Sequence, residues 1–200
     1  GKVTGQARYA EDYRADGMVF LKTYDSPMPH ARVTNIDASE ALAMDGVVSR
    51  GWLHVENQAP IIKDINDDAQ ALHLMQRELY HRGISNHYFF CGRDIVAYQA
   101  FNVPIETAWN LLNDSQKGLS GVENHARLSI THYKGKTEVA AVTNEAIPGV
   151  PQSENGVLIF KNLRNALDAP DRGKVCIVGR NPEAIWFDDY EDRVIYDELG

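Results

Sequence analysis

Cysteine is scarce in this sequence: Cys91 and Cys176 are the only two in 200 residues. Two thiols cannot hold a domain of this size together through many disulfides, and Cys176 lies in an apolar stretch, where a free thiol acts as a small hydrophobic side chain. The set is also too small for an iron–sulfur cluster. We therefore expect a reducing, cytoplasmic setting; an exported chain whose signal has been cleaved is the alternative.

Positive charge is also in deficit, with 20 Lys and Arg against 28 Asp and Glu and a net charge of −8. Such a chain repels a phosphate backbone, and no basic stripe offsets the excess, so nucleic acid is not an expected partner. No apolar run approaches the roughly 20 residues that a membrane helix needs, and the first residues lack the apolar core of a secretion signal. Membrane insertion is not expected either.

The sequence does have the material for a core, since 44% of its residues are hydrophobic and 9% are aromatic. A chain of this length and composition folds as one or two domains. It opens without Met and closes directly after an expected strand, which suggests a processed chain, a subunit or a piece of something longer.

Patterning predicts strands and short helices along the whole chain. Asp37 stands three residues before Glu40, the spacing of a capping box at the start of a helix. Pro104 begins a second helix near its first turn, and Asn181 before Pro182 predicts a third. The expected strands are 18–23, 31–36, 127–133, 137–142, 157–160, 175–178 and 193–196, with a strand start at 47–48; the expected helices are 39–44, 67–82, 106–112 and one from 182, and 94–101 is a strand or a short helix.

The best local cluster of metal-ligand types is His81, His87 and Cys91. Zinc needs three or four converging N or S ligands, and this cluster has gaps of six and four residues with no fourth ligand nearby. Histidines hydrogen-bonded around a turn are the favoured interpretation. Cys91 is also the best candidate for a nucleophile, but its aromatic neighbours Tyr88, Phe89 and Phe90 favour a packed core thiol.

Two further stretches could carry chemistry. The segment 178–182 could offer backbone amides to an anion, although its single glycine favours a tight structural turn. The acidic run 188–192 has adjacent rather than converging carboxylates, which favours a solvated face. No nucleophile elbow, phosphate loop or dinucleotide fingerprint occurs. We therefore predict no catalytic, cofactor-binding or metal-binding residue in this chain.

Several blocks resemble the molybdenum-binding subunit of the xanthine oxidase and aldehyde oxidase superfamily. The opening contains the ordered pattern of glycines, a Ser-Pro-x-x-His-Ala-Arg run and an Ile-Asp-x-Ser-x-Ala-Leu run that begins this subunit. The closing strand also resembles the last strand of the family's α/β hammerhead domain. The matching stretches are 4–12, 17–18, 26–33, 36–42, 46–47, 142–149 and 175–199.

The resemblance implies an α+β fold, an α/β hammerhead with a partly helical insertion. Residues 1–49 and 139–200 would form one discontinuous hammerhead domain. Residues 50–138, which match nothing in the family, would be an insertion of mixed helix and hairpin.

By the same resemblance, the chain would be a non-catalytic structural domain of a molybdopterin-dependent hydroxylase that oxidises an aldehyde, an N-heterocycle or a related substrate. The molybdenum–pterin cofactor would be bound outside this chain, and FAD and iron–sulfur clusters would lie on partner domains or subunits. Its partners would be these molybdenum-binding, iron–sulfur and flavin parts. The alternative is a stand-alone ligand-binding or protein-interaction module without redox activity.

Overall fold

The computed structural model describes residues 14–16, 18, 39–40, 54–93, 95–133, 135–164 and 172–199. The chain divides into two compact units, Gly1–Ser49 and Arg50–Gly200. In the first unit Ser39 and Glu40 are helical, within the predicted helix 39–44. The strands predicted at 18–23, 31–36 and 47–48 lie outside the described residues, except for Met18.

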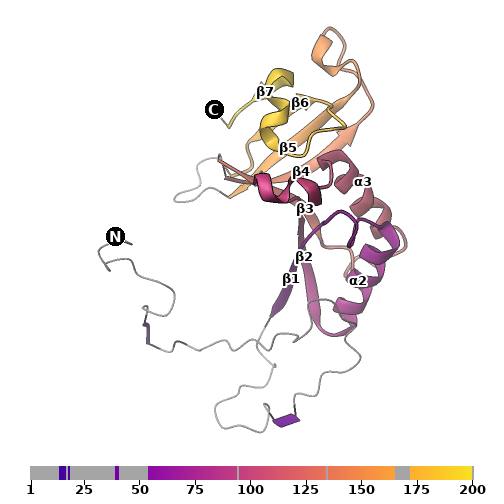
Figure 1. Cartoon of the computed structure of the whole chain (residues 1–200), viewed down its shortest axis with the longest axis vertical. Coiled ribbons are helices and arrows are strands. Elements are labelled where there is room, and N and C mark those ends of the chain that lie inside the picture. Colours follow the sequence, from indigo (N-terminus) through magenta and orange to yellow (C-terminus); the bar gives the residue numbers. More distant parts are fainter. Residues whose placement is uncertain are drawn as a thin grey trace. The chain divides into compact units, whose positions relative to one another are not determined.

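The described part of the second unit is built on one mixed seven-stranded sheet, whose strands neighbour one another in sequence order. Helices pack on this sheet, which confirms the predicted α+β class (Figure 1). The strands are β1 (Val55–Pro60), β2 (Ile84–Phe90), β3 (Arg127–His132), β4 (Gly135–Thr143), β5 (Val157–Arg164), β6 (Val175–Gly179) and β7 (Val194–Asp197).

The first three strands run parallel, and a helix lies in each connection between them. Parallel neighbours need such crossovers because the chain must return to the same end of the sheet. Helix α2 (Ala69–His81) links β1 to β2, and the 3-10 helix η3 (Val96–Phe101) with helix α3 (Ile105–Gln116) links β2 to β3. Both α-helices lie side by side against β1–β3 (Figure 1).

The remaining strands, β3 to β7, pair antiparallel. The hairpin predicted from 127–133 and 137–142 is confirmed as β3 and β4. The strands predicted at 157–160, 175–178 and 193–196 are confirmed as β5, β6 and β7. The stretch 94–101, predicted as a strand or a short helix, contains η3.

Local sequence explains where the helices begin. Asp68 caps α2, because its Oδ1 accepts a hydrogen bond of 2.8 Å from the amide of Ala71. Pro104 is the N-cap of α3, as predicted near the first turn. On α2, Leu72 and Gln76 are buried, whereas Leu74 is 49% exposed.

The hydrophobic core lies between the sheet and its helices. Leu72 from α2 and Ile105, Ala108 and Leu112 from α3 belong to the same buried cluster as Phe89, Leu128 and Ile130 from the sheet. The 3-10 helix η5 (Phe187–Arg193) adds Phe187, whose ring stacks on His132 at a centroid distance of 4.0 Å. The core therefore uses residues from both sides of the predicted boundary at 138/139.

One prediction needs correction here. No helix begins at Pro182; residues 182–183 form a turn, and the helical segment is η5. The boundary at 138/139 in the predicted domain division lies inside β4. β4 pairs with β3 on one side and β5 on the other, so residues 54–132 and 139–199 share one sheet within the unit Arg50–Gly200.

Candidate functional site

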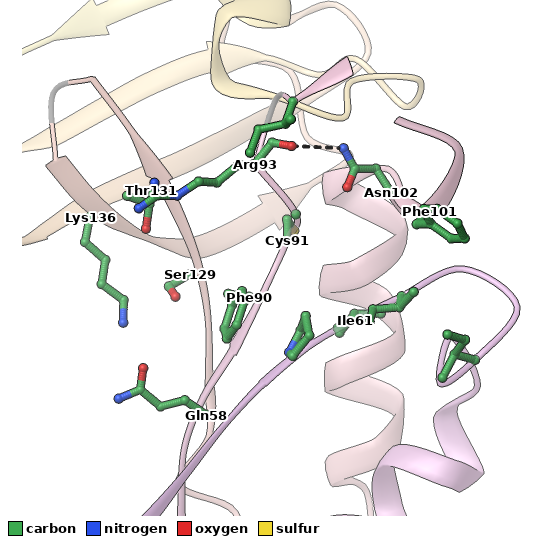
Figure 2. Close-up of a pocket in the computed structure, with 15 residues that line it drawn as sticks. Gln58, Ile61, Phe90, Cys91, Arg93, Phe101, Asn102, Ser129, Thr131 and Lys136 are labelled. Atoms are coloured by element: carbon green, nitrogen blue, oxygen red, sulfur yellow. Dashed lines mark hydrogen bonds between the residues drawn. The ribbon is translucent and has the colours of Figure 1, made fainter. Parts of the chain in front are cut away.

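A pocket of about 610 Å³ lies at the carboxyl ends of the three parallel strands (Figure 2). Pro60 and Phe90, which end β1 and β2, line it together with the residues that follow them. The carboxyl ends of parallel strands are where α/β sheets bind ligands, because the connecting loops leave a crevice there. The sequence prediction missed this site, since β1 and β2 were not recognised as strands.

One wall of the pocket is polar. Figure 2 shows Ser129, Lys136 and Gln58 around the same open space, with Arg93 and Thr131 above it. The Nζ atom of Lys136 lies 3.5 Å from the centroid of the Tyr88 ring. Arg93 also lines this side of the pocket.

Ser129 carries the strongest sign of a ligand. Its side chain is fully buried, yet its Oγ has no hydrogen-bond partner in the described structure. Leaving a buried hydroxyl unpaired costs about 1–3 kcal/mol, so such groups usually meet a ligand or a water. Because Ser129 lines the pocket, a bound polar group would satisfy this hydroxyl.

The opposite wall is apolar and comes from the loops after β1 and β2. Figure 2 places Ile61 and Phe101 on this side, with Phe90 and Cys91 between the two walls. Ile65, Ile95 and Phe101 are 71%, 44% and 54% exposed, respectively. A cluster of exposed large apolar side chains around a pocket is typical of a binding site. The apolar lining residues are Pro60, Ile61, Ile62, Ile65, Phe90, Ile95 and Phe101.

Backbone contacts fix the loops that form the apolar wall. Asn66 accepts a hydrogen bond of 2.6 Å from the amide of Ile62 and donates one of 2.9 Å to the carbonyl of Pro60. The amide of Lys63 donates to the carbonyl of Phe101, which joins the two loops. Gly92 lies close to the side chain of Asn102, which would have to shift if a Cβ atom were added there.

The turn at 178–182, considered as an anion-binding site, binds a carboxylate of the protein itself, that of Glu106. The amide of Asn181 donates to Oε1 of Glu106 at 2.8 Å, and Arg180 pairs with Oε2 of the same carboxylate at 2.7 Å. Glu106 is 2% exposed. This turn therefore serves to hold α3 against the end of β6, in agreement with the favoured structural interpretation.

The three metal-ligand candidates, His81, His87 and Cys91, each contact different residues. His81 Nε2 is 3.6 Å from Glu123, and His87 Nδ1 is 3.5 Å from Glu56. Cys91 is buried at the pocket, and burial raises the pKa of its thiol to about 12, so it is protonated at neutral pH. The prediction of a packed core thiol is confirmed.

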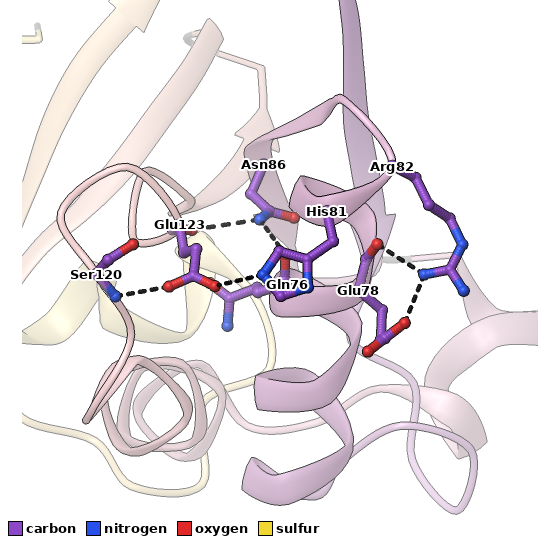
Figure 3. Close-up of polar contacts among 7 residues, drawn as sticks. All are labelled: Gln76, Glu78, His81, Arg82, Asn86, Ser120 and Glu123. Carbon is purple, nitrogen blue, oxygen red and sulfur yellow. Dashed lines mark hydrogen bonds and ion pairs between the residues drawn. The ribbon is translucent and has the colours of Figure 1, made fainter.

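The contacts of Glu123 tie the loop after α3 to α2 (Figure 3). Its Oε2 accepts a hydrogen bond of 2.8 Å from the amide of Ser120. Asn86 donates to the carbonyls of Gln76 and Glu123, so β2 joins the same group. We assign these residues a structural role, because they lie outside the pocket lining.

The acidic run 188–192 is mostly exposed, as predicted, but Asp189 has a structural task. Its Oδ2 accepts hydrogen bonds from the amides of Ile185 and Trp186, which caps η5. Within the described ranges, no three His, Cys, Asp or Glu residues come together as a metal site requires.

Residues 4–83 are similar to a domain of a family of redox enzymes. This range matches the family model described as the a/b hammerhead domain of aldehyde oxidase and xanthine dehydrogenase. The match confirms the resemblance predicted from the opening of the sequence; it ends at residue 83 and does not extend to 139–199. That family comprises molybdopterin-dependent enzymes with molybdenum, iron–sulfur and flavin parts.

Two similar curated proteins belong to this class. The chain is 44% identical over 46 residues to a nicotinate dehydrogenase large molybdopterin subunit of Eubacterium barkeri, covering 23% of this chain and 11% of that protein. It is 47% identical over 47 residues to a xanthine dehydrogenase of Drosophila pseudoobscura, covering 23% and 4%. These similarities concern less than a quarter of the chain.

A longer similarity leads to a different enzyme. The chain is 32% identical over 165 residues to a putative L-lysine 2,3-aminomutase of Aquifex aeolicus, covering 82% of this chain and 40% of that protein. Since Gly1–Ser49 holds only 49 residues, most of this similarity must lie in the unit Arg50–Gly200. The chain spans less than half the length of each relative described here.

No helix in the described ranges combines the length and the apolar composition that are needed to cross a membrane.

Proposed function

We propose that the unit Arg50–Gly200 is the small-molecule-binding part of an enzyme that acts on an amino acid or a related compound. The observation that carries this proposal is the buried, unpartnered hydroxyl of Ser129 in the pocket at the ends of β1–β3. The similarity to a protein named as an L-lysine aminomutase, over 82% of the chain, supports an amino acid as the ligand class.

The chemistry of the polar wall also supports an amino acid. Arg93 and Lys136 attract a carboxylate, and the side-chain oxygens of Gln58, Ser129 and Thr131 can accept hydrogen bonds from an ammonium group. A cationic lining stands out in a chain with a net charge of −8. The pocket is thus suited to a zwitterion.

Ser129→Ala tests this proposal. Isothermal titration calorimetry with a panel of L-amino acids should detect binding to the unaltered protein, and S129A should weaken it by about tenfold, because a hydrogen bond to a charged group is lost. Removing an unpaired buried hydroxyl should leave stability unchanged or slightly higher.

Thr137→Val is the matched control. The Oγ1 atom of Thr137 is also buried without a partner, but Thr137 does not line the pocket. T137V should therefore leave ligand affinity unchanged. Absence of binding by every amino acid at about 10 mM, or an equal loss in both variants, would refute the proposed site.

A second function is favoured by the match of residues 4–83 to the hammerhead family model. In this proposal the chain is a non-catalytic domain of a cytoplasmic molybdenum hydroxylase acting on an aldehyde, an N-heterocycle or a related substrate. Partner domains or subunits would hold the molybdenum–pterin cofactor, FAD and iron–sulfur clusters.

Metal analysis tests this second function. A native complex purified through a tag on this chain should contain about one molybdenum atom per chain, together with bound flavin and iron. A complex without molybdenum would exclude this function while leaving the amino-acid proposal intact.

A further inference from the structure

The two walls of the pocket differ in a way that restricts the ligand. Polar and cationic groups form one side, whereas five apolar side chains from the loops after β1 and β2 form much of the other: Ile61, Ile62, Ile65, Ile95 and Phe101. A ligand that spans the pocket from the polar wall must place its far end against this apolar wall.

The described lining residues supply no anionic partner for the far end of the ligand, since none of these 15 residues is acidic. An ammonium group placed against the apolar side chains would lose part of its hydration without gaining a counter-charge from this lining. An alkyl group would instead cover apolar surface that is now exposed to water, which is favourable.

Ile65, Ile95 and Phe101 are 71%, 44% and 54% exposed, so substantial apolar surface remains to be covered. Their loops are joined by the hydrogen bond from Lys63 to Phe101, which presents the apolar wall in a fixed arrangement. Burying this surface is the main gain that an alkyl end would make.

We infer that the pocket accepts an amino acid or carboxylate with an uncharged, apolar side chain and rejects one whose side chain ends in an ammonium group. This inference rests on the proposed function of the pocket. It assigns Ile65, Ile95 and Phe101 as residues that determine specificity, and it distinguishes the ligand of this chain from the L-lysine in the name of its relative.

L-norleucine and L-lysine test the inference directly, because they share the α-amino acid group and a four-carbon side chain and differ in the terminal ammonium. Isothermal titration calorimetry on the full chain should give a dissociation constant for L-norleucine at least about tenfold lower than that for L-lysine. Hexanoate and 6-aminohexanoate should show the same order of affinity.

Ile65→Asp adds the missing counter-charge at an exposed position, so folding should be retained. I65D should bind L-lysine more tightly and L-norleucine more weakly than the unaltered chain, which narrows or reverses the preference. Val122→Asp is the control, since Val122 is 52% exposed and does not line the pocket. V122D should keep the original preference.

The outcomes separate the inference from the proposed function. Equal or tighter binding of L-lysine would overturn the inference and leave the pocket as an amino-acid site. Failure of all four ligands to bind would overturn both. A shift of preference in V122D as large as that in I65D would show that net charge, rather than the apolar wall, sets specificity, and would also overturn the inference.

Discussion

Glu106 connects α3 to the segment that follows β6 through a buried carboxylate. Its carboxylate is 2% exposed and receives hydrogen bonds from both Arg180 and the amide of Asn181. Arg180 also donates to the side chain of Asn144. One buried anion thus fixes two loops, and its charge is balanced by a single guanidinium.

Glu106→Gln should destabilise the chain by about 3 kcal/mol, because it leaves a mostly buried guanidinium without its counter-ion. Glu138→Gln is the control: its partner Arg127 lies 3.4 Å away with a side chain that is 56% exposed, so the loss should stay below about 1 kcal/mol. Urea denaturation followed by circular dichroism measures both. An equal loss of stability in the two variants would contradict the structural role of Glu106.

At the scale of elements, Glu123 joins α2 to the loop that follows α3. Hydrogen bonds from Ser120, first from its side chain and then from its backbone, lower the pKa of Glu123 below its usual 4.5. A carboxylate with a lowered pKa stabilises the fold fully above pH 4.5 and loses this contribution as the pH falls through the lowered value.

Glu123→Gln should therefore lower the urea midpoint at pH 7, and the difference from the unaltered protein should shrink progressively as the pH falls below 4.5. The exposed pair of Asp114 and Lys117 provides the comparison, because Asp114→Asn should change little at pH 7. A constant difference between E123Q and the unaltered protein across this range would exclude a role for ionisation.

The turn before β5 depends on a glycine. Gly156 has φ of +93°, and a Cβ atom there would collide with the carbonyl oxygen of Thr143. Gly149 has a similar φ of +80° but open space around it. Gly149→Ala should cost about 1 kcal/mol from backbone conformation alone, and Gly156→Ala clearly more in the same denaturation experiment. A similar loss of stability in both variants would contradict the predicted collision at Gly156.

Some elements could be predicted from sequence because their signals are local. The helix from 67 to 82 has an Asp cap and a terminal glycine, and the hairpin has alternating strands around Gly135, so both were predicted. β1 and β2 were missed because Glu56, Asn57 and Gln58, like Ser85 to His87, are polar residues within strands. Some of these polar side chains make contacts with residues that are distant in the sequence, and such contacts cannot be read from a local pattern.

The helix predicted from Pro182 was wrong for the same reason. Glu106, 75 residues earlier in the sequence, accepts a hydrogen bond from the amide of Asn181. Asp189 accepts hydrogen bonds from the amides of Ile185 and Trp186. The pocket could not be predicted either. Gln58 is far from Ser129 and Lys136 in the sequence, and the three come together only through the pairing of the strands that carry them. The buried thiol of Cys91 could be predicted from its aromatic neighbours alone.

At the scale of the whole molecule, the units Gly1–Ser49 and Arg50–Gly200 differ from the division predicted by resemblance. The family match covers 4–83 and so crosses the observed boundary, since β1 and α2 lie in the unit Arg50–Gly200. Sequence similarity and packing therefore divide this chain at different places.

Removal of residues 1–49 tests which division governs folding. The remaining 50–200 should unfold in one cooperative transition with nearly the midpoint of the full chain, because all seven described strands and the described buried core lie within it. If a hammerhead made of 1–49 and 139–200 were the folding unit, the shortened chain would lose its near-ultraviolet circular dichroism. Thermal and urea denaturation distinguish the two.

The position of β1 has a consequence for handling the protein. β1 pairs with β2 alone among the described strands, so one side of its backbone carries amides and carbonyls that no other described strand occupies. An open margin of this kind is a template for adding a strand from another molecule. Concentrated solutions of residues 50–200 should therefore self-associate through β1, and light scattering against concentration would reveal it.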